Sequence, residues 1–260
     1  KIKERINARN SLESYVYSVK NSLEEDKIKK VASEDEIKQI KASEVSTTKG
    51  GVHFLADPKD ALEFMLLSRI ASRLFKKVYK FEIKIEKDLY FFAKEIKWKS
   101  LFDLEQTFKI TTQQSKNSKG QWSKFKSSMF LSQNLKDGIV DKFRFDTKGE
   151  RPSVDKENPD IHLLLHIEPN INPHSVKEDV TILIDMCGSP LSNRGYRDTN
   201  FSAPLKENLA AALVKLSGYN AQEHFVDPMC GSATILIESL LIKGNIPPSF
   251  IAVHEILENK

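Results

Sequence analysis

The stretch VDPMCGSATILIES, residues 226–239, constrains the fold of this chain more than any other segment. Its apolar start predicts the end of a buried strand, its small residues predict a tight turn, and its apolar second half predicts a helix. A helix over Leu205–Ser217 and a strand in EHFVDPMC are predicted just before the turn. Helix, strand, glycine turn and helix in this order indicate the beginning of an α/β doubly wound domain, whose turns hold nucleotide-like cofactors.

Residues 35–190 are predicted to fold as an α+β arrangement of strands and helices. Alternating apolar residues predict short strands on both sides of the Gly50-Gly51 turn and a strand in VYKFEIKIEKDLYFFA. A further strand is predicted in TFKITT, and the strands IHLLLHIEP and DVTILIDMC are expected to pair as a hairpin.

Helix signals lie between these strands. The pair Asp57-Pro58 is typical of a helix start, and the period of LSQNLKDGIVDKFRF predicts a helix over residues 131–145. Apolar residues at helical spacing predict a charged helix over residues 1–30. Ser33 and Glu36 form a capping-box pattern for a short helix over residues 34–41.

The segment Gln106–Lys136 contains no Asp or Glu. Its lysines alternate with aromatic residues, a combination that suits phosphate contacts and base stacking, so it predicts a surface for a polyanion. The alternative is a solvated lysine-rich loop over an ordinary core, and residues 113–127 are predicted to be a mobile loop. The six lysines are Lys109, Lys116, Lys119, Lys124, Lys126 and Lys136.

Several classes of protein are disfavoured by the composition. No apolar run is long enough for a transmembrane helix, and the charged start KIKERINARN is unlike a signal peptide. Cys187 and Cys230 suggest neither a disulfide framework nor a zinc site. We therefore expect a cytoplasmic protein without a metal.

Six blocks occur in the order found in one protein family. They resemble the THUMP-domain RNA methyltransferases, most closely the bacterial enzymes that form N2-methylguanine in 23S, large-subunit ribosomal RNA. The resemblance covers about residues 35–250 and implies S-adenosylmethionine (SAM) as cofactor and ribosomal RNA as partner. The blocks are GVHFLADPKDAL, LKDGIVDKFR, GERPSVDKENPDI, LSNRGYRD, APLKENLAAALVKLSGY and VDPMCGSATILIES.

The resemblance implies a layout of consecutive domains. A ferredoxin-like piece is expected at residues 35–64, a THUMP RNA-binding domain at 65–186 and the N-terminal part of a class I SAM methyltransferase domain at 187–260. Residues 1–34 form a separate helical segment, in which RNSLESYVYSVKN resembles the C-terminal lid of Hsp70 chaperones. A natural fusion, a chimera, two joined sources or a generic charged helix would each explain that likeness.

The resemblance also implies roles for individual residues. Ala233 stands where the family has glycine, and a positive φ there would strain the turn by about 1 kcal/mol or more. Arg194 and Arg197 are each expected either to contact RNA phosphate or to form a salt bridge. The expected cofactor-binding residues are Asp227, Pro228, Cys230, Gly231, Ser232, Ala233, Thr234, Pro204 and Glu207. The expected RNA-binding residues are Lys109, Lys116, Lys119, Lys124, Lys126, Arg194 and Arg197.

The family's base-holding motif, an Asn- or Asp-Pro-Pro-Tyr/Phe segment, does not occur after Ser239. Asn245-Ile246-Pro247-Pro248 follows the glycine turn too soon and is interpreted as a helix-ending connection. Glu255 lies in a helix-like stretch and is a poor ribose-binding acid. We therefore expect the RNA-binding portion of a methyltransferase that is incomplete for catalysis, with no catalytic residue assigned. The alternatives are a non-catalytic THUMP RNA-binding module and an Hsp70-related segment.

Overall fold

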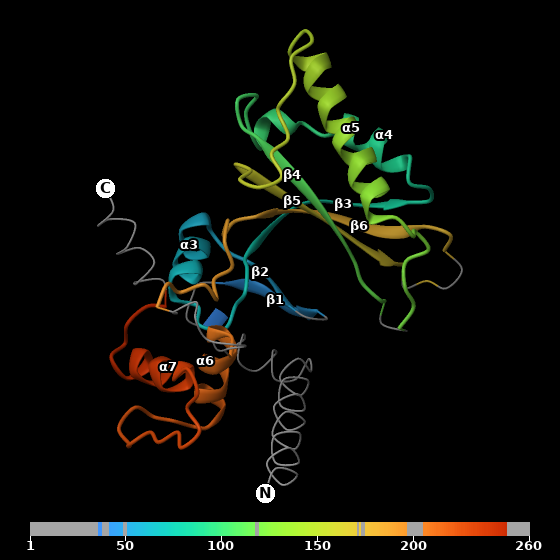
Figure 1. Cartoon of the computed structure of the whole chain (residues 1–260). Helices are drawn as coiled ribbons and strands as arrows, with labels where there is room; N and C mark the ends of the chain where they lie inside the picture. The colour runs from blue at the N-terminus through green and yellow to red at the C-terminus, as the bar shows by residue number, and fades with distance from the viewer. Residues whose placement is uncertain are drawn as a thin grey trace, which may run out of the picture. The chain divides into compact units, whose positions relative to one another are not determined.

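The computed structural model describes residues 36–37, 42–48, 51–117, 120–170, 172, 175–196 and 205–248. The chain divides into two compact units (Figure 1). Residues 73–188 form the inserted unit, so called because it lies in sequence between the two parts of the other. The outer unit combines the described residues up to Ser72 with those from Ser189 onward. The helix predicted over residues 1–30 lies outside the described residues, as does most of the helix predicted over 34–41, of which Glu36 and Ile37 are helical.

The inserted unit is built on a four-stranded sheet in the order β3-β6-β5-β4. Its strands are β3 (Phe75–Ile83), β4 (Phe108–Gln114), β5 (Ile161–Pro169) and β6 (Glu178–Asp185). β5 and β6 pair antiparallel, which confirms the predicted hairpin, and β3 pairs antiparallel with β6. β4 runs parallel to β5, so the chain must cross over between them, and α5 (Ser128–Asp146) lies in that crossover.

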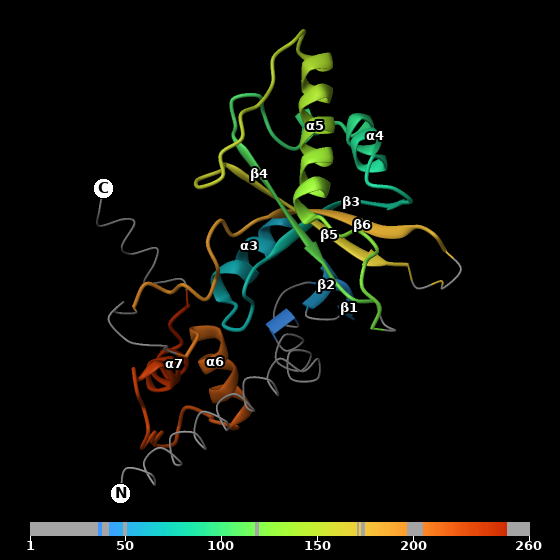
Figure 2. The same cartoon turned by 45° about the vertical axis from the view of Figure 1, so that its right-hand side comes forward.

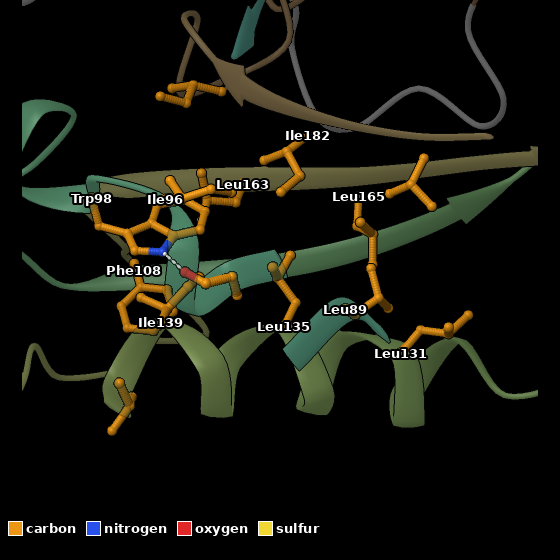
Figure 3. Packing of buried hydrophobic residues seen from close by; sticks show 14 of the residues in the cluster. Leu89, Ile96, Trp98, Phe108, Leu131, Leu135, Ile139, Leu163, Leu165 and Ile182 are labelled. Atoms are coloured by element: carbon orange, nitrogen blue, oxygen red, sulfur yellow. Dashed lines mark hydrogen bonds between the residues drawn. The ribbon is translucent and has the colours of Figure 1, made fainter. Parts of the chain in front are cut away.

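Two helices, α4 (Asp88–Glu95) and α5, cover one face of this sheet (Figures 1 and 2). Alternation along β5 turns Leu163 and Leu165 toward the helices, where they meet Leu135 of α5 (Figure 3). Trp98 is fully buried in the same cluster, and its Nε1 donates to the carbonyl of Ala93 at 2.7 Å. The apolar side chains thus form one core between the helices and the sheet.

The sequence placed the end of β3 too late and missed α4. Asp88 accepts hydrogen bonds from the backbone amides of Lys84 at 2.7 Å and Ile85 at 3.0 Å, so the chain turns immediately after the strand. The predicted helix over 131–145 is confirmed but begins earlier, because Ser127 accepts from the amide of Phe130 and caps α5.

Besides the helical residues Glu36 and Ile37, the described parts of the outer unit contain a hairpin and three complete helices. The hairpin of β1 (Ser43–Thr48) and β2 (Gly51–Leu55) is antiparallel, as predicted. α3 (Pro58–Leu67) begins directly after Asp57, as the Asp-Pro pair indicated. α6 (Glu207–Leu216) and α7 (Thr234–Lys243) pack against each other. None of the described helices in either unit has the length and apolar character needed to cross a membrane.

The strand predicted in EHFVDPMC is wrong, because residues 223–230 have no regular secondary structure. The side chain of Val226 is 79% exposed, whereas a strand of a doubly wound sheet is buried on both faces. A strand needs a neighbour for its backbone hydrogen bonds, and the β1–β2 pair is the only sheet among the described residues of this unit.

Candidate functional site

The predicted cofactor turn, residues 227–234, is held by hydrogen bonds between residues close in sequence. The amide of Met229 donates to Oδ1 of Asp227 at 3.0 Å, and the amide of Ala233 donates to the carbonyl of Cys230 at 2.7 Å. The hydroxyls of Ser232 and Thr234 lie 3.0 Å apart. These bonds bring residues 227–234 together as a closed turn that leads directly into α7.

Ala233 has a φ of +58° and a ψ of +16°, so it lies in the left-handed region. This is the conformation in which the sequence predicted strain, because the alanine Cβ crowds the backbone there at a cost of about 1 kcal/mol or more. Gly231, with a φ of +53°, meets the same requirement without a side chain. The position before α7 therefore has the left-handed conformation that favours glycine, although alanine occupies this position.

The turn offers the groups that the amino-acid portion of SAM requires. The first amides of α7 have no helical partner and favour a carboxylate, while the carboxylate of Asp227 suits an ammonium group. A Cβ built on Gly231 meets no atom within 4 Å, so this backbone is open to close approach. The donor set fits the cofactor, although Pro204 lies outside the described residues. Glu207 is buried in the first turn of α6.

Next to the turn, Arg194 and Glu238 form an ion pair that is almost fully buried, with exposed side-chain fractions of 1% and 0%. The hydroxyl of Tyr196 donates to the other oxygen of Glu238 at 2.6 Å. Burial raises the pKa of Glu238 by more than Arg194 and Tyr196 lower it. Burial, followed by the hydrogen bond to Glu238, also raises the pKa of Tyr196.

This burial corrects the prediction for Arg194. Of its two expected roles, phosphate contact or salt bridge, the structure shows the salt bridge and leaves almost no guanidinium surface for RNA. Arg197 lies outside the described residues. The sequence carried a signal for the pair, because an isolated acid in the apolar helix TILIESLLIK requires a buried partner.

The same network reaches the N-terminal part of the outer unit. Arg194 donates to the carbonyl of Arg69, whose own Nη2 donates to the carbonyl of Leu241 at 3.3 Å and of Ile246 at 2.5 Å. Burial lowers the pKa of Arg69. These bonds attach the segment after α3 to α7 at Leu241 and to the segment after α7 at Ile246.

Glu36 forms a second junction in this network. Its carboxylate accepts from the hydroxyl of Ser68 at 2.6 Å, the amide of Arg69 at 2.9 Å and the ammonium of Lys215 at 2.8 Å. Glu36 thereby links the segment after α3 to α6. The sequence indicated only a helix-cap role for Glu36, because its partners Ser68 and Lys215 are distant in sequence.

The predicted RNA-binding lysines lie in the inserted unit, on β4 and in the loop that follows it. Lys109 is half-buried on β4, and Lys126 is exposed. Lys116 Nζ lies 5.3 Å from the centroid of the Trp122 ring, while Lys124 Nζ donates to the carbonyl of Val176. Lys119 lies outside the described residues.

The loop between β4 and α5 is attached to the unit, contrary to the prediction of a mobile segment. Its Phe125 is buried in the main core. The buried carboxylate of Glu178 accepts from the hydroxyl of Ser123 and, at 2.6 Å, from the amide of Lys124. The described part of the loop is therefore fixed by core packing and by a charged acceptor.

Neither cysteine forms a disulfide: Cys187 is half-buried and Cys230 is exposed. Burial raises the pKa of the Cys187 thiol. Within the described ranges, no group of three or more His, Cys, Asp or Glu side chains could hold a metal ion.

Family models match three consecutive parts of the chain. Residues 32–75 match the RlmL ferredoxin-like domain, residues 84–171 match the THUMP domain, and residues 194–258 match the RMKL-like methyltransferase domain. The fold and these matches define a class of protein, in which a THUMP domain is combined with a methyltransferase domain. The three matches support the resemblance of this chain to the THUMP-domain RNA methyltransferases. The matches begin at residue 32 and give no support to the Hsp70 resemblance of residues 1–30.

Solved structures of similar proteins also support a relationship to methyltransferases. A predicted N6-adenine-specific DNA methylase from Listeria monocytogenes is 28% identical, with a TM-score of 0.68 over 83% of this chain and 53% of its own. A candidate methylase from Clostridium difficile 630 is 27% identical, with a TM-score of 0.69 over 85% and 54%. SMU.472, described as a candidate methyltransferase and solved with SAH, is 26% identical, with a TM-score of 0.68 over 86% and 55%. The chain therefore spans about half the length of these proteins.

Proposed function

We propose that this chain is the RNA-binding and cofactor-turn portion of a SAM-dependent methyltransferase that forms N2-methylguanine in large-subunit ribosomal RNA. The order of the three matched domains is the observation that carries the proposal. The proposed boundaries are those expected from the sequence, with the ferredoxin-like piece at 35–64, the THUMP domain at 65–186 and the methyltransferase part from 187.

The proposed cofactor site uses the closed turn at the start of α7. SAM, when bound, supplies a methyl group already activated by its sulfonium. Asp227 would hold the ammonium of its methionine portion, and the open backbone at Gly231 and Ser232 would bind beside it. Pro204 and Glu207 are proposed to flank the turn. These residues position the cofactor and take no proton from the acceptor base.

The inserted unit would bring the RNA to this machinery. The proposed phosphate-binding residues of the inserted unit are Lys109, Lys116, Lys119, Lys124 and Lys126. Arg197, in the outer unit, is proposed as a further phosphate contact. A loop of fixed shape that carries several lysines suits a phosphate backbone, because the charges are already arranged before binding. No described residue is assigned to hold the methylated amine, so we propose that this chain alone does not complete the transfer.

A non-catalytic RNA-binding module is the second candidate. It is favoured by one observation, the absence of a strand at residues 223–230, since a doubly wound domain would place a buried strand there. The two candidates differ in cofactor binding, which only the first requires.

Calorimetry with SAH tests the choice between them. The methyltransferase proposal predicts SAH binding that is lost in Asp227→Ala and retained in the exposed control Asn220→Ala. Failure of the chain to bind SAH would favour the non-catalytic module. In a second arm, radiolabelled SAM is incubated with unmodified large-subunit RNA or with adenine-containing DNA. Methylation of either nucleic acid by this chain alone would contradict the proposed catalytic incompleteness. N6-methyladenine as the product would show that adenine, and not guanine, is the methylated base.

A further inference from the structure

The two tryptophans of this chain lie in opposite environments. Trp98 is buried in the core and hydrogen-bonded, whereas Trp122 is 62% exposed on the loop between β4 and α5. The ammonium of Lys116 lies 5.3 Å from the centroid of the Trp122 ring, within the range of a cation–π contact. A large aromatic surface that faces water beside a cation suggests a ligand contact.

Hydrogen bonds join Asn117 to Gln121, the residue directly before Trp122. The amide of Asn117 donates to the carbonyl of Gln121 at 3.0 Å, and the amide of Gln121 donates back to Oδ1 of Asn117 at 3.0 Å. The side-chain amide of Asn117 also donates to Oε1 of Gln121 at 3.0 Å. These bonds fix the backbone of Gln121, on the N-terminal side of the exposed ring.

The segment after Trp122 is fixed as firmly. Ser123 and Lys124 donate to Glu178, and Phe125 is buried in the core. Anchors on both sides hold Trp122 outward, so the ring loses little freedom when a ligand binds, which increases affinity.

The charge of the loop selects the class of ligand. The segment Gln106–Lys136 contains no acid, and the nearby Glu178 is buried against loop donors. An occupant must therefore present negative charge together with a flat face that can stack on an indole. An unpaired nucleotide has both, since its phosphate suits Lys116 and its base suits Trp122.

We propose that Trp122 and Lys116 form a stacking site for one unpaired nucleotide of the RNA that this unit binds. The inference deepens the proposed function and rests on its RNA binding. A base-paired helix keeps its bases stacked inside the duplex, so the site selects single-stranded segments over duplex. Trp122 is thereby assigned to recognition of an unpaired base, beside the phosphate contact of Lys116.

Tryptophan fluorescence with a labelled RNA tests this site, because Trp98 serves as a buried internal reference. A short unstructured RNA should quench the emission of Trp122, while a blunt RNA duplex of equal length should quench it far less. Trp122→Leu should abolish the quenching and weaken binding of the unstructured RNA by about 5- to 160-fold, the range for loss of one stacked base. Lys116→Gln should reduce both the quenching and the affinity for the unstructured RNA.

Phe145→Leu is the matched control. Phe145 is also exposed, and Lys142 Nζ lies 5.5 Å from the centroid of its ring. Phe145 lies near the C-terminal end of α5, away from the loop that carries Trp122. This variant should bind RNA as the parent chain does. Salt-dependent RNA binding that Trp122→Leu leaves unchanged would overturn the stacking site while the proposed function stands. Absence of any RNA binding would overturn both. Quenching by anionic phosphatidylserine vesicles but not by RNA would show a membrane contact and also overturn the site.

Discussion

Arg194 and Glu238 form a buried ion pair that connects the segment before α6 to the middle of α7, across 44 residues of sequence. Removal of one partner would leave an uncompensated charge in a site with almost no access to water. Arg194 is also bonded to Arg69, so the pair lies at the centre of the polar network of the outer unit.

Arg194→Met should lower the free energy of unfolding by about 3–5 kcal/mol, the usual cost of leaving a buried charge without its partner. Urea denaturation measures this change. The exposed control Arg151→Met should be close to neutral. RNA affinity measured well below the unfolding transition should not change. A selective loss of RNA affinity without loss of stability would restore the phosphate-binding role for Arg194.

Glu238 should make the stability of the chain depend on pH. Its pKa is raised above the ordinary value of 4.5, mainly by burial, so the folded state holds its proton more tightly than the unfolded state. The contribution of Glu238 to the free energy of unfolding is therefore complete below pH 4.5, and it is lost as the pH rises through the pKa of Glu238 in the folded state.

A pH series of denaturation experiments with Glu238→Gln tests this sign. The unfolding free energy of the parent minus that of the variant should decrease as the pH rises above 4.5, by at most about 1.4 kcal/mol per pH unit. The exposed control Glu223→Gln should show no comparable trend. If the parent-minus-variant difference in unfolding free energy grew with pH, burial would not be the largest influence on the pKa of Glu238.

Ala233→Gly should stabilise the chain, because glycine adopts a φ of +58° without the Cβ crowding that alanine suffers. Relief of about 1 kcal/mol corresponds to a rise in melting temperature of about 2–4 °C. Ala221, with a φ of +67°, provides a matched alanine outside the turn. Both glycine variants should melt higher, and only Ala233→Gly should alter SAH affinity. No stabilisation in either would show that the left-handed alanines are not strained.

Gly138→Ala should destabilise the inserted unit. A Cβ at this position would lie 2.5 Å from the Cβ of Ala93 and 2.6 Å from the carbonyl oxygen of Tyr90, so α4 and α5 would have to separate. Overpacking of this kind costs about 1–3 kcal/mol. Thermal unfolding monitored by circular dichroism would measure it, with the exposed Gln133→Ala on the same helix as control. Equal stability of the two variants would mean that the helices part easily.

Local patterns predicted the parts of the fold that local forces determine. Alternation along β5 and β6 predicted the hairpin, because one face of each strand packs on the helices. The Asp57-Pro58 pair predicted the start of α3, because proline suits a first helical turn. α4 was missed because DLYFFA combines strong strand formers with apolar spacing that also suits a strand, and the turn at Asp88 depends on contacts that composition does not display.

The polar network of the outer unit required information that single segments lack. Glu238 signalled a buried partner, but both Arg194 and Arg197 were candidates in the same block, and only packing selects between them. Glu36 had a local explanation as a helix cap, although its partners Ser68 and Lys215 lie 32 and 179 residues away in sequence. The turn itself was predictable in shape, yet the conformation of Ala233 was not.

Salt titration of RNA binding tests the central claim most directly, that the loop of the inserted unit binds an RNA backbone. With an unstructured RNA and three to four lysine–phosphate contacts, the logarithm of the binding constant should fall linearly with the logarithm of salt concentration, with a slope of about −2 to −3. The variant with Lys116, Lys124 and Lys126 replaced by glutamine should bind weakly with a shallower slope. RNA binding that is absent, or that keeps its affinity and slope in this variant, would contradict the claim.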